Sequence, residues 1–314
     1  MKHVNIAVLG SKELSGKLGK KGTSSDFSLY NLKESNSIAC FLEPTTYPEK
    51  LQPLLYSISL ADYIVLVVEK VDKFLGETIV ALDLLGKKNG LLAVSDGVSE
   101  PLVNQVIAGT VAASYERVPL DATEIRVKAI SFSPERKAGP VKIPVDHSFN
   151  VKSVGNVVLG VVERGEVKKH QKLELLPAGK QVEAKSLQVH DQDVSSAETG
   201  SRVGVSVKGA ELEEMRRGSV LAEPGSLRAS GKIAGKLTVS KYFKQGVKPG
   251  AQFFYSRGMQ FIQARLLGEK QLLPGESAGV ELELSSPAVF EKGDKALIAF
   301  PDSKDLRIAG LLDV

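Results

Sequence analysis

Gly10, Gly16 and Lys17 are the residues near the start of the sequence whose types and spacing could do chemistry. They follow an apolar run at residues 4–9 that is typical of a buried strand. A strand, a glycine-rich loop and a helix form a phosphate-binding loop, in which backbone N–H groups surround phosphates and a lysine reaches the outer ones. Here five residues, instead of four, separate Gly10 from Gly16, and Leu18 occupies the position of the hydroxyl that holds Mg²⁺. We therefore favour a turn before a short or irregular segment over a working phosphate site.

The elements after this loop should form a nucleotide-type α/β domain. A buried strand is expected at residues 38–42, and the segment between, 18–37, is polar and rich in glycine and serine, so we expect no full helix in it. Residues 51–68 predict a helix and a second buried strand, residues 75–86 an amphipathic helix, and residues 91–94 a parallel strand. Residues 115–132 predict one or two closing strands. The alternation predicts a compact, doubly wound α/β domain.

The rest of the chain predicts β structure. Within residues 144–177, alternating apolar positions at Val157, Leu159 and Val161 predict a strand with one buried side. Three glycines mark positions where strands would bend, bulge or turn: Gly155, Gly160 and Gly165. Short strands with glycine corners favour a small barrel. Residues 229–314 alternate apolar and polar positions between glycine and proline turns, which predicts a second one.

The 144–177 stretch, with SLQVHDQDVSSAETGSRVGVSVKG and MRRGSVLAE after it, resembles the second domain of translation elongation factors of the EF-Tu type. The pair Asp146-His147 is most similar to the archaeal and eukaryotic selenocysteine-specific, or SelB-type, branch. Weaker matches extend the resemblance over nearly the whole chain. It implies an α/β plus all-β protein: a reduced P-loop GTPase-like α/β domain with closing strands (1–132), a linker (133–140) and two EF-Tu-type β-barrels (141–224 and 229–314).

The resemblance also shows what the α/β domain has changed. At the place of the family motif D-x-P-G-H, which supports Mg²⁺ and the attacking water, the chain has the segment from Glu43 to Tyr47. At the place of N-K-x-D, which reads guanine, Val98 stands where the aspartate should be, and Asp96 is two positions early. The first switch segment is shortened. We therefore expect GTP binding and hydrolysis to be lost or severely impaired, with no cofactor unless the loop still binds GTP and Mg²⁺. The vestigial nucleotide-binding residues would be Gly10, Gly16, Lys17 and Glu43.

In this family the first barrel carries the pocket for the aminoacyl end of tRNA, and the matching residues are Asp146, His147, Phe149 and Arg202. An apolar ring stacks on the terminal adenine or the amino acid, and polar neighbours bind its amino or carbonyl group. The alternatives are a core role for Phe149 and a turn role for His147. A threonine common in the pocket is replaced by Leu159.

Basic residues elsewhere have simpler explanations. We expect Arg216-Arg217-Gly218 to be a solvated turn. Six basic residues of the second barrel could contact tRNA phosphates, or could be ordinary surface: Lys232, Lys236, Lys241, Lys244, Lys248 and Arg257.

Composition sets broad limits. The 314 residues are 42% hydrophobic and 25% charged, typical of a folded, soluble protein, and no apolar run approaches the roughly 18 residues that span a bilayer. The net charge of +4 permits a nucleic-acid partner without requiring one. Cys40 is the only cysteine, and His3, His170 and His190 lack metal-binding spacing, so we expect no disulfide within the chain and no metal site. We expect a cytoplasmic protein.

Three functions remain open at this stage. The first is a catalytically silent SelB-like factor that binds tRNA or aminoacyl-tRNA through its barrels, with the ribosome as a possible partner. The second is an active GTP-dependent factor that delivers a special aminoacyl-tRNA; similar methanogen proteins have been considered as factors for pyrrolysine. The third is a regulatory scaffold whose α/β domain binds a translation protein. Because the sequence ends at Val314, we expect no counterpart of the additional C-terminal domain of SelB-type factors.

Overall fold

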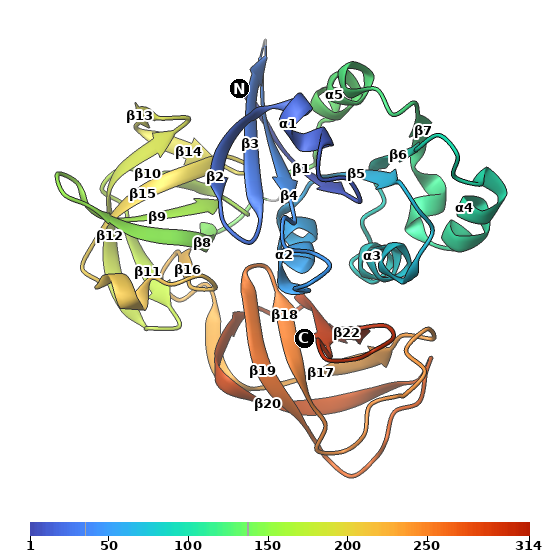
Figure 1. The fold of residues 1–314 in the computed structure, drawn as a ribbon. Helices are drawn as coiled ribbons and strands as arrows, with labels where there is room; N and C mark the ends of the chain where they lie inside the picture. The colour runs from blue at the N-terminus through green and yellow to red at the C-terminus, as the bar shows by residue number, and fades with distance from the viewer. Residues whose placement is uncertain (35, 137) are drawn as a thin grey trace.

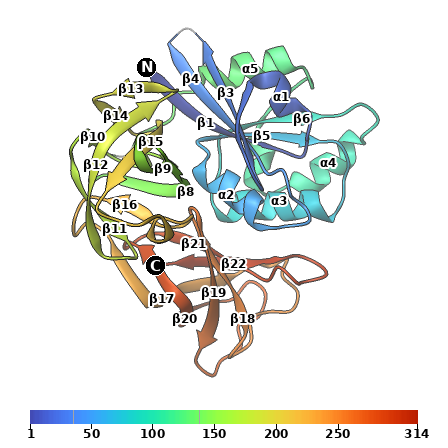
Figure 2. The same ribbon diagram turned by 60° about the vertical axis from the view of Figure 1, so that its left-hand side comes forward.

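Three bodies form the chain: an α/β domain, a first β-barrel beside it and a second β-barrel below them (Figures 1 and 2). The structure is a computed structural model that describes residues 1–34, 36–136 and 138–314. Ser35, within the segment expected to lack a helix, and Lys137, within the predicted linker, lie outside the described residues. The fold class predicted from the sequence is confirmed.

The α/β domain is built on a seven-stranded sheet with the order β2-β3-β4-β1-β5-β6-β7. The strands from β4 to β7 run parallel, and β2 and β3 form an antiparallel extension at one edge. Their bounds are β1 (Lys2–Leu9), β2 (Lys20–Ser24), β3 (Ser28–Glu34), β4 (Ser37–Glu43), β5 (Tyr63–Val68), β6 (Gly90–Val94) and β7 (Glu116–Val118).

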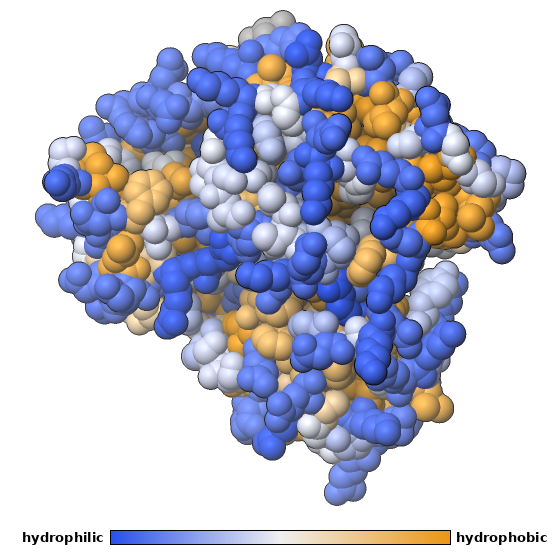
Figure 3. All heavy atoms as spheres, viewed as in Figure 1, coloured by the Kyte–Doolittle hydropathy of each residue, from blue (hydrophilic) through white to orange (hydrophobic). Residues whose placement is uncertain are grey.

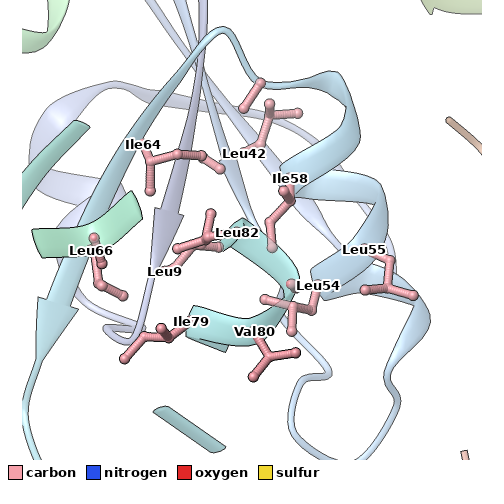
Figure 4. Packing of buried hydrophobic residues seen from close by; sticks show 14 of the residues in the cluster. Leu9, Leu42, Leu54, Leu55, Ile58, Ile64, Leu66, Ile79, Val80 and Leu82 are labelled. Carbon is pink, nitrogen blue, oxygen red and sulfur yellow. The ribbon is translucent and has the colours of Figure 1, made fainter. Parts of the chain in front are cut away.

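Helices cover both faces of this sheet, as predicted for a doubly wound domain. One face packs against α2 (Gln52–Leu60), α3 (Lys73–Leu84) and α4 (Glu100–Ile107), and the other against α1 (Leu14–Leu18) and α5 (Ala122–Ser131). A short 3-10 helix, η1 (Val111–Ser114), precedes β7. Figure 4 shows the first core, where Leu9, Leu42, Ile64 and Leu66 of the strands meet leucine, isoleucine and valine side chains of α2 and α3.

Two expectations for this domain need correction. The second predicted closing strand is the helix α5, because the Asp121 side chain caps its N-terminus by accepting from the Glu124 N–H at 2.8 Å, and Ile125 and Ala129, one helical turn apart, both lie in the core. The segment after the first loop has no helix among its described residues beyond α1, as expected, but it forms the β2–β3 hairpin, which the sequence did not indicate.

The first barrel closes through the ring β11-β16-β8-β9-β15-β12, in which β12 pairs back to β11. Its strands are β8 (Lys142–Val151), β9 (Gly155–Val161), β11 (Lys172–Leu176), β12 (Lys180–Val189), β15 (Arg202–Lys208) and β16 (Val220–Ala222). Smaller elements decorate it: β10 (Glu166–Lys168), β13 (Gln192–Val194), β14 (Ser196–Glu198) and the 3-10 helix η2 (Leu212–Glu214).

The predicted strand in β9 exists, but its core side is different. Val158 is fully buried in the barrel core, and of the three predicted positions Val161 is buried, whereas Val157 and Leu159 are only half-buried. Both faces of this strand are apolar, so alternation alone could not identify the inner one. Gly160 behaves as predicted, because a Cβ there would lie 2.4 Å from the Pro144 carbonyl oxygen.

The second barrel is a closed ring with the order β17-β20-β19-β18-β21-β22. Its strands are β17 (Arg228–Val239), β18 (Gln252–Arg257), β19 (Gln260–Leu267), β20 (Ser277–Phe290), β21 (Lys295–Ala299) and β22 (Ile308–Asp313). The face seen in Figure 3 is mostly hydrophilic, with apolar patches gathered over α4 and its surroundings. Among the helices described, none is long and apolar enough to cross a membrane.

Candidate functional site

The carboxyl ends of the central strands surround a cavity of about 630 Å³. Gly10 at the end of β1, Glu43 at the end of β4 and Val67 near the end of β5 all line it. Ligands of open α/β sheets bind at this edge, where the connections from neighbouring strands diverge. This cavity is therefore the first candidate site.

Gly10 is held by close packing in the loop that begins this site. Its φ is +87°, and a Cβ at this position would lie 2.0 Å from the Val67 carbonyl oxygen, so only glycine fits. The loop therefore rests directly on β5. The helix that follows, α1, has only five residues, which confirms the expectation of a turn before a short segment.

Ser11, Lys12 and Glu13 of the loop line the cavity, but the two predicted phosphate-binding residues on α1 do not. Gly16 and Lys17 are exposed on α1 and are not among the residues that line it. Leu18 is 1% exposed and packs in the core between α1, α5 and the sheet, beside Leu14. The position that carries a metal-binding hydroxyl in a phosphate loop thus points into the hydrophobic core. Of the four predicted nucleotide-binding residues, the structure brings only Gly10 and Glu43 together.

Glu43, at the end of β4, places a buried carboxyl group beside the cavity. Its side chain is nearly inaccessible, with 5% of the residue exposed, and its Oε2 atom has no hydrogen-bond partner among the described residues. Burial raises the pKa of this carboxyl, against the opposing effects of the nearby Ser15 hydroxyl and of the charges of Lys21 and Lys12. A buried acceptor without a partner costs free energy, so a group of this kind commonly marks a functional site.

Tyr47, which stands at the position of the family's water-positioning histidine, is engaged in a contact between domains. Its hydroxyl donates to the Phe74 carbonyl oxygen at 2.9 Å and lies 3.0 Å from Oε1 of Glu77. Glu77 in turn is paired with Arg307 of the second barrel, whose Nε donates to Oε2 at 2.9 Å. The Arg307 guanidinium also donates to the Pro48 carbonyl oxygen at 2.8 Å. The segment after β4 is thereby fastened to the second barrel.

The segment that aligns with the guanine-reading motif carries no acceptor at the expected position. Val98 is half-buried and packs against the core cluster of α2, α3 and the sheet, whereas Asp96 is exposed. This arrangement agrees with the residue types predicted to be unsuited to guanine.

The second candidate site lies on β8 and β15 of the first barrel, where three predicted residues meet. The Asp146 side chain is fully buried, and both of its oxygens accept from the guanidinium of Arg202, Oδ1 at 3.0 Å. Nδ1 of His147 lies 2.7 Å from the same Oδ1. This arginine holds the pKa of Asp146 below its ordinary value despite the cost of burial, which acts in the opposite direction.

The tip of the β2–β3 hairpin covers this group. The Ser25 hydroxyl lies 3.1 Å from Nε2 of His147, and the ring of Phe27 lies 5.6 Å from the imidazole. Both ring nitrogens of His147 therefore have partners. The predicted aminoacyl-end residues Asp146, His147 and Arg202 are brought together, but as an interdomain junction whose polar groups satisfy one another.

Arg217 completes this junction, so the expectation of a solvated turn at 216–218 is wrong for this residue. Its Nε donates to the Asp146 carbonyl oxygen at 3.0 Å, and its Nη1 donates to Asp26 of the hairpin at 2.7 Å. The guanidinium also lies over the Phe27 ring at 5.3 Å. Arg216 alone behaves as predicted and is exposed. Sequence reasoning missed Arg217 because Asp26 is 191 residues away in the chain.

Phe149 is the exception among the predicted aminoacyl-end residues. It lies on β8 with 41% of its surface exposed, so the alternative of a core residue does not hold. The alternative for His147, a turn residue bonded to backbone, does not hold either, because it lies in β8 and its ring contacts side chains.

One of the basic residues proposed for phosphate contacts is unavailable for them. Arg257 is 9% exposed and lies between the barrels, with Nη2 2.7 Å from Asp294 and 3.2 Å from Glu163. The five lysines remain exposed: Lys232, Lys236, Lys241, Lys244 and Lys248. Among the residues that the structure describes, no group of three or more His, Cys, Asp or Glu side chains is placed to hold a metal ion.

An α/β domain with a mostly parallel sheet, followed by two six-stranded barrels, makes up the three-domain architecture of the chain. The family described as Elongation factor Tu domain 2 matches residues 155–222. The structure is similar to that of translation elongation factor SelB from Methanococcus maripaludis in complex with the GTP analogue GppNHp, with a TM-score of 0.83 and 21% identity over all of this chain and 79% of that one.

Two proteins of Methanocaldococcus jannaschii are similar to this chain in sequence. An uncharacterized protein of Methanocaldococcus jannaschii, MJ0325, is 34% identical over 99% of both chains. The selenocysteine-specific elongation factor of the same organism is 31% identical over 55% of this chain and 41% of its own length. The match thus spans about two fifths of that factor. Residues 155–222 belong to the Elongation factor Tu domain 2 family, and the chain as a whole is similar to SelB-type, selenocysteine-specific elongation factors.

Proposed function

We propose that this SelB-like elongation factor homologue binds tRNA or aminoacyl-tRNA through its barrels, and that GTP binding and hydrolysis are lost or severely impaired. One observation carries the second half of the proposal: Leu18 is in the hydrophobic core, while Lys17 is exposed outside the cavity. The lysine charge and the metal-binding hydroxyl are the two groups that a phosphate loop brings to a triphosphate.

Three further features of the cavity support this half of the proposal. Glu43, which stands at the place of the family's Mg²⁺-supporting aspartate, is buried, and burial raises its pKa. Tyr47 is committed to Glu77 and Phe74. Val98 cannot accept the N–H donors of guanine. The residues present therefore do not fit GTP and Mg²⁺.

At the first barrel we propose different roles for the four aminoacyl-end residues. Phe149 is exposed and offers a ring on which a terminal base can stack. Asp146 and Arg202 are paired with each other, and His147 is covered by the hairpin tip. These three would support the Phe149 strand, and they would meet a ligand only after Ser25 and Phe27 move away. The exposed lysines of the second barrel supply positive charge for the phosphates of a tRNA stem.

Calorimetric titration of nucleotide-free protein tests the second half of this proposal, the loss of GTP binding. GTP and GDP with Mg²⁺ should give no binding heat at high-micromolar concentrations while the protein remains folded. Micromolar binding, with GTP turnover that Lys17→Ala abolishes, would contradict the proposal and would favour the active factor. The relatives named as selenocysteine-specific factors make this comparison worthwhile, because a SelB structure with a GTP analogue exists for the same fold.

Filter binding with aminoacylated and bare tRNA at low salt tests the RNA half. Phe149→Ala should weaken the binding of aminoacyl-tRNA by about 10-fold or more, since stacking contributes roughly 1–3 kcal/mol per base. Leu273→Ala is a matched control, because Leu273 is an exposed apolar residue of the second barrel. Failure of the folded protein to bind either RNA would contradict the proposal.

One observation favours a scaffold as the second candidate function. Three large apolar side chains are exposed on or beside α4 and α5: Leu102, Leu120 and Val127. Figure 3 shows apolar surface over α4. Leu102 lies on α4 and Val127 on α5, which cover opposite faces of the sheet, and exposed apolar groups on a domain surface commonly mark protein contacts. Recovery of a translation protein without RNA from a lysate, lost in a Leu102→Asp/Val127→Asp variant, would favour this function over RNA binding.

A further inference from the structure

The cavity at the carboxyl ends of β1, β4 and β5 has the composition of a small-molecule site, although it does not suit a nucleotide. Its volume of about 630 Å³ is within the range of ligand pockets. Apolar residues make much of its lining, including Val8, Leu66 and Leu75. Glu43, which is buried and has an oxygen without a partner, is the principal polar group deep in this lining.

The charges around this cavity do not favour an anion. Four carboxylates line it, those of Glu13, Glu43, Glu69 and Asp72, against two lysines, Lys12 and Lys70. Lys70 is paired with Asp72 at 2.8 Å. The N-terminus of α3, which could otherwise attract an anion, is already capped, because the Asp72 side chain accepts from the N–H groups of Phe74 and Leu75.

The walls present aromatic and proline surface. The rings of Tyr47 and Phe74 line the cavity and meet edge to face, with centroids 6.1 Å apart. The Tyr47 hydroxyl is occupied by Phe74 and Glu77, so this residue offers its ring rather than its polar end. Pro44 and Pro48 extend the same wall. The Arg307 guanidinium already lies over both rings, 5.6 Å from the Tyr47 centroid and 5.8 Å from the Phe74 centroid. The remaining aromatic surface beside a carboxylate suits a cation with an apolar body.

From this geometry we infer that the cavity binds a compact organic amine, with its ammonium group paired to the Glu43 carboxylate and its apolar or aromatic body against Tyr47 and Phe74. Such a ligand would bring a cationic partner to the Glu43 side chain, which lines the cavity. It would also be favoured by the excess of acidic groups at the rim. The same acidic groups would repel a triphosphate.

Ligand-observed NMR titration with two probes of nearly equal shape tests this inference. Benzylamine carries the ammonium group, and benzyl alcohol replaces it with a neutral hydroxyl. On the wild-type protein at pH 7.5 we expect benzylamine to bind at least 10-fold more tightly than benzyl alcohol, with weak affinities in the range of about 1 mM. The affinity ratio is measured on the wild-type protein, so the test does not depend on whether a Glu43 variant folds.

Glu43→Gln locates the effect. It keeps the shape of the side chain and removes the charge, so the two probes should then bind within about 3-fold of each other. Glu13→Gln is the matched control, because Glu13 is an exposed residue at the cavity rim and its loss should leave most of the preference in place.

Three results would overturn the inference. They are no binding of benzylamine by the folded protein, equal binding of the two probes by the wild type, and an amine preference that survives in Glu43→Gln. Tighter binding of GTP with Mg²⁺ than of benzylamine at the same site would also overturn it. The tRNA assays with Phe149→Ala involve a different surface, so they succeed or fail independently.

Discussion

The cavity of the α/β domain and the junction between the β2–β3 hairpin and the first barrel each contain a buried carboxyl group. The two groups differ in their hydrogen-bond partners. In the cavity, Glu43 is buried with an oxygen that has no partner among the described residues. At the junction, Asp146 is buried more completely, yet each of its side-chain oxygens accepts from Arg202. Their pKa values consequently move in opposite directions, upward for Glu43 and downward for Asp146.

This difference shows how the same carboxylate chemistry can serve binding or structure. A buried carboxylate that has a full set of partners contributes to one defined arrangement of its surroundings, and removing a partner is costly. A buried carboxylate that lacks one is destabilising by itself, and a ligand can relieve that cost. The cavity is thus the site of the ligand proposed above, whereas the Asp146 group joins the β2–β3 hairpin to the first barrel.

The largest effect should come from restoring the motif residue of the phosphate loop. Leu18→Ser recreates a hydroxyl at the metal-binding position, but it removes a leucine side chain from the core and buries a hydroxyl among apolar groups. We expect a loss of about 4–6 kcal/mol in the free energy of unfolding, measured by urea titration, and no gain of Mg²⁺-dependent GTP binding. Lys17→Ser, at the exposed neighbour, should change stability by about 0.5 kcal/mol or less.

Asp146→Ala should be the next most damaging change, because it leaves Arg202 largely buried without its carboxylate. The expected loss is roughly 3–5 kcal/mol. Because the folded-state pKa of Asp146 is depressed, its contribution is present above the ordinary value of 3.8 and is lost as the pH falls below it. The double variant Asp146→Ala/Arg202→Leu should recover part of the loss. If the single variant unfolds at the wild-type urea concentration, the structural role of this pair is refuted.

Arg217→Ala should have an intermediate effect on the same junction. It removes hydrogen bonds to Asp26 and to the Asp146 carbonyl oxygen, together with the contact on the Phe27 ring. We expect a loss of about 1–3 kcal/mol and faster hydrogen exchange in the β2–β3 hairpin. The adjacent, exposed Arg216→Ala is the control and should stay within about 0.5 kcal/mol of wild type. Equal effects of the two substitutions would argue against the junction.

Glu43→Gln should have the smallest effect, with the opposite sign. The folded-state pKa of Glu43 is raised, so its protonated form contributes stability below the ordinary value of 4.5, and this contribution is lost as the pH rises through the raised value. The glutamine variant should therefore be as stable as wild type or more stable by up to about 1 kcal/mol at pH 7, with a smaller difference at pH 4. Thermal unfolding at the two pH values measures this. Marked destabilisation at pH 7 would show that Glu43 is satisfied in the protein.

Local patterns predicted much of this fold. The α/β alternation, the strands β1, β4, β5 and β6, and the glycine-cornered strands of the first barrel follow from apolar periodicity and turn residues. The errors arose where two patterns compete. Residues 122–131 contain β-branched and apolar residues typical of a strand. They form the helix α5 instead, because the Asp121 side chain caps its N-terminus. The β2–β3 hairpin lies in a polar segment, and its strand pairing with β4 became apparent only in the assembled sheet.

For the candidate sites too, the sequence predicted the features that depend on residue type and missed those that depend on distant contacts. The sequence predicted that Leu18, Tyr47 and Val98 are unsuited to GTP chemistry, and it placed Asp146 beside His147, because these predictions depend on residue type and on neighbours in the chain.

The sequence alone therefore determined the fold class, the family resemblance and the residues that depart from the nucleotide motifs. Only the tertiary structure decided that Arg217 reaches Asp26 over 191 residues, that Arg307 reaches Glu77 over 230, and that Glu43 is left without a partner inside a cavity. The physical reason is one of range. Periodicity and turn chemistry act within a few residues, whereas ion pairing and burial depend on which distant segments the fold brings together.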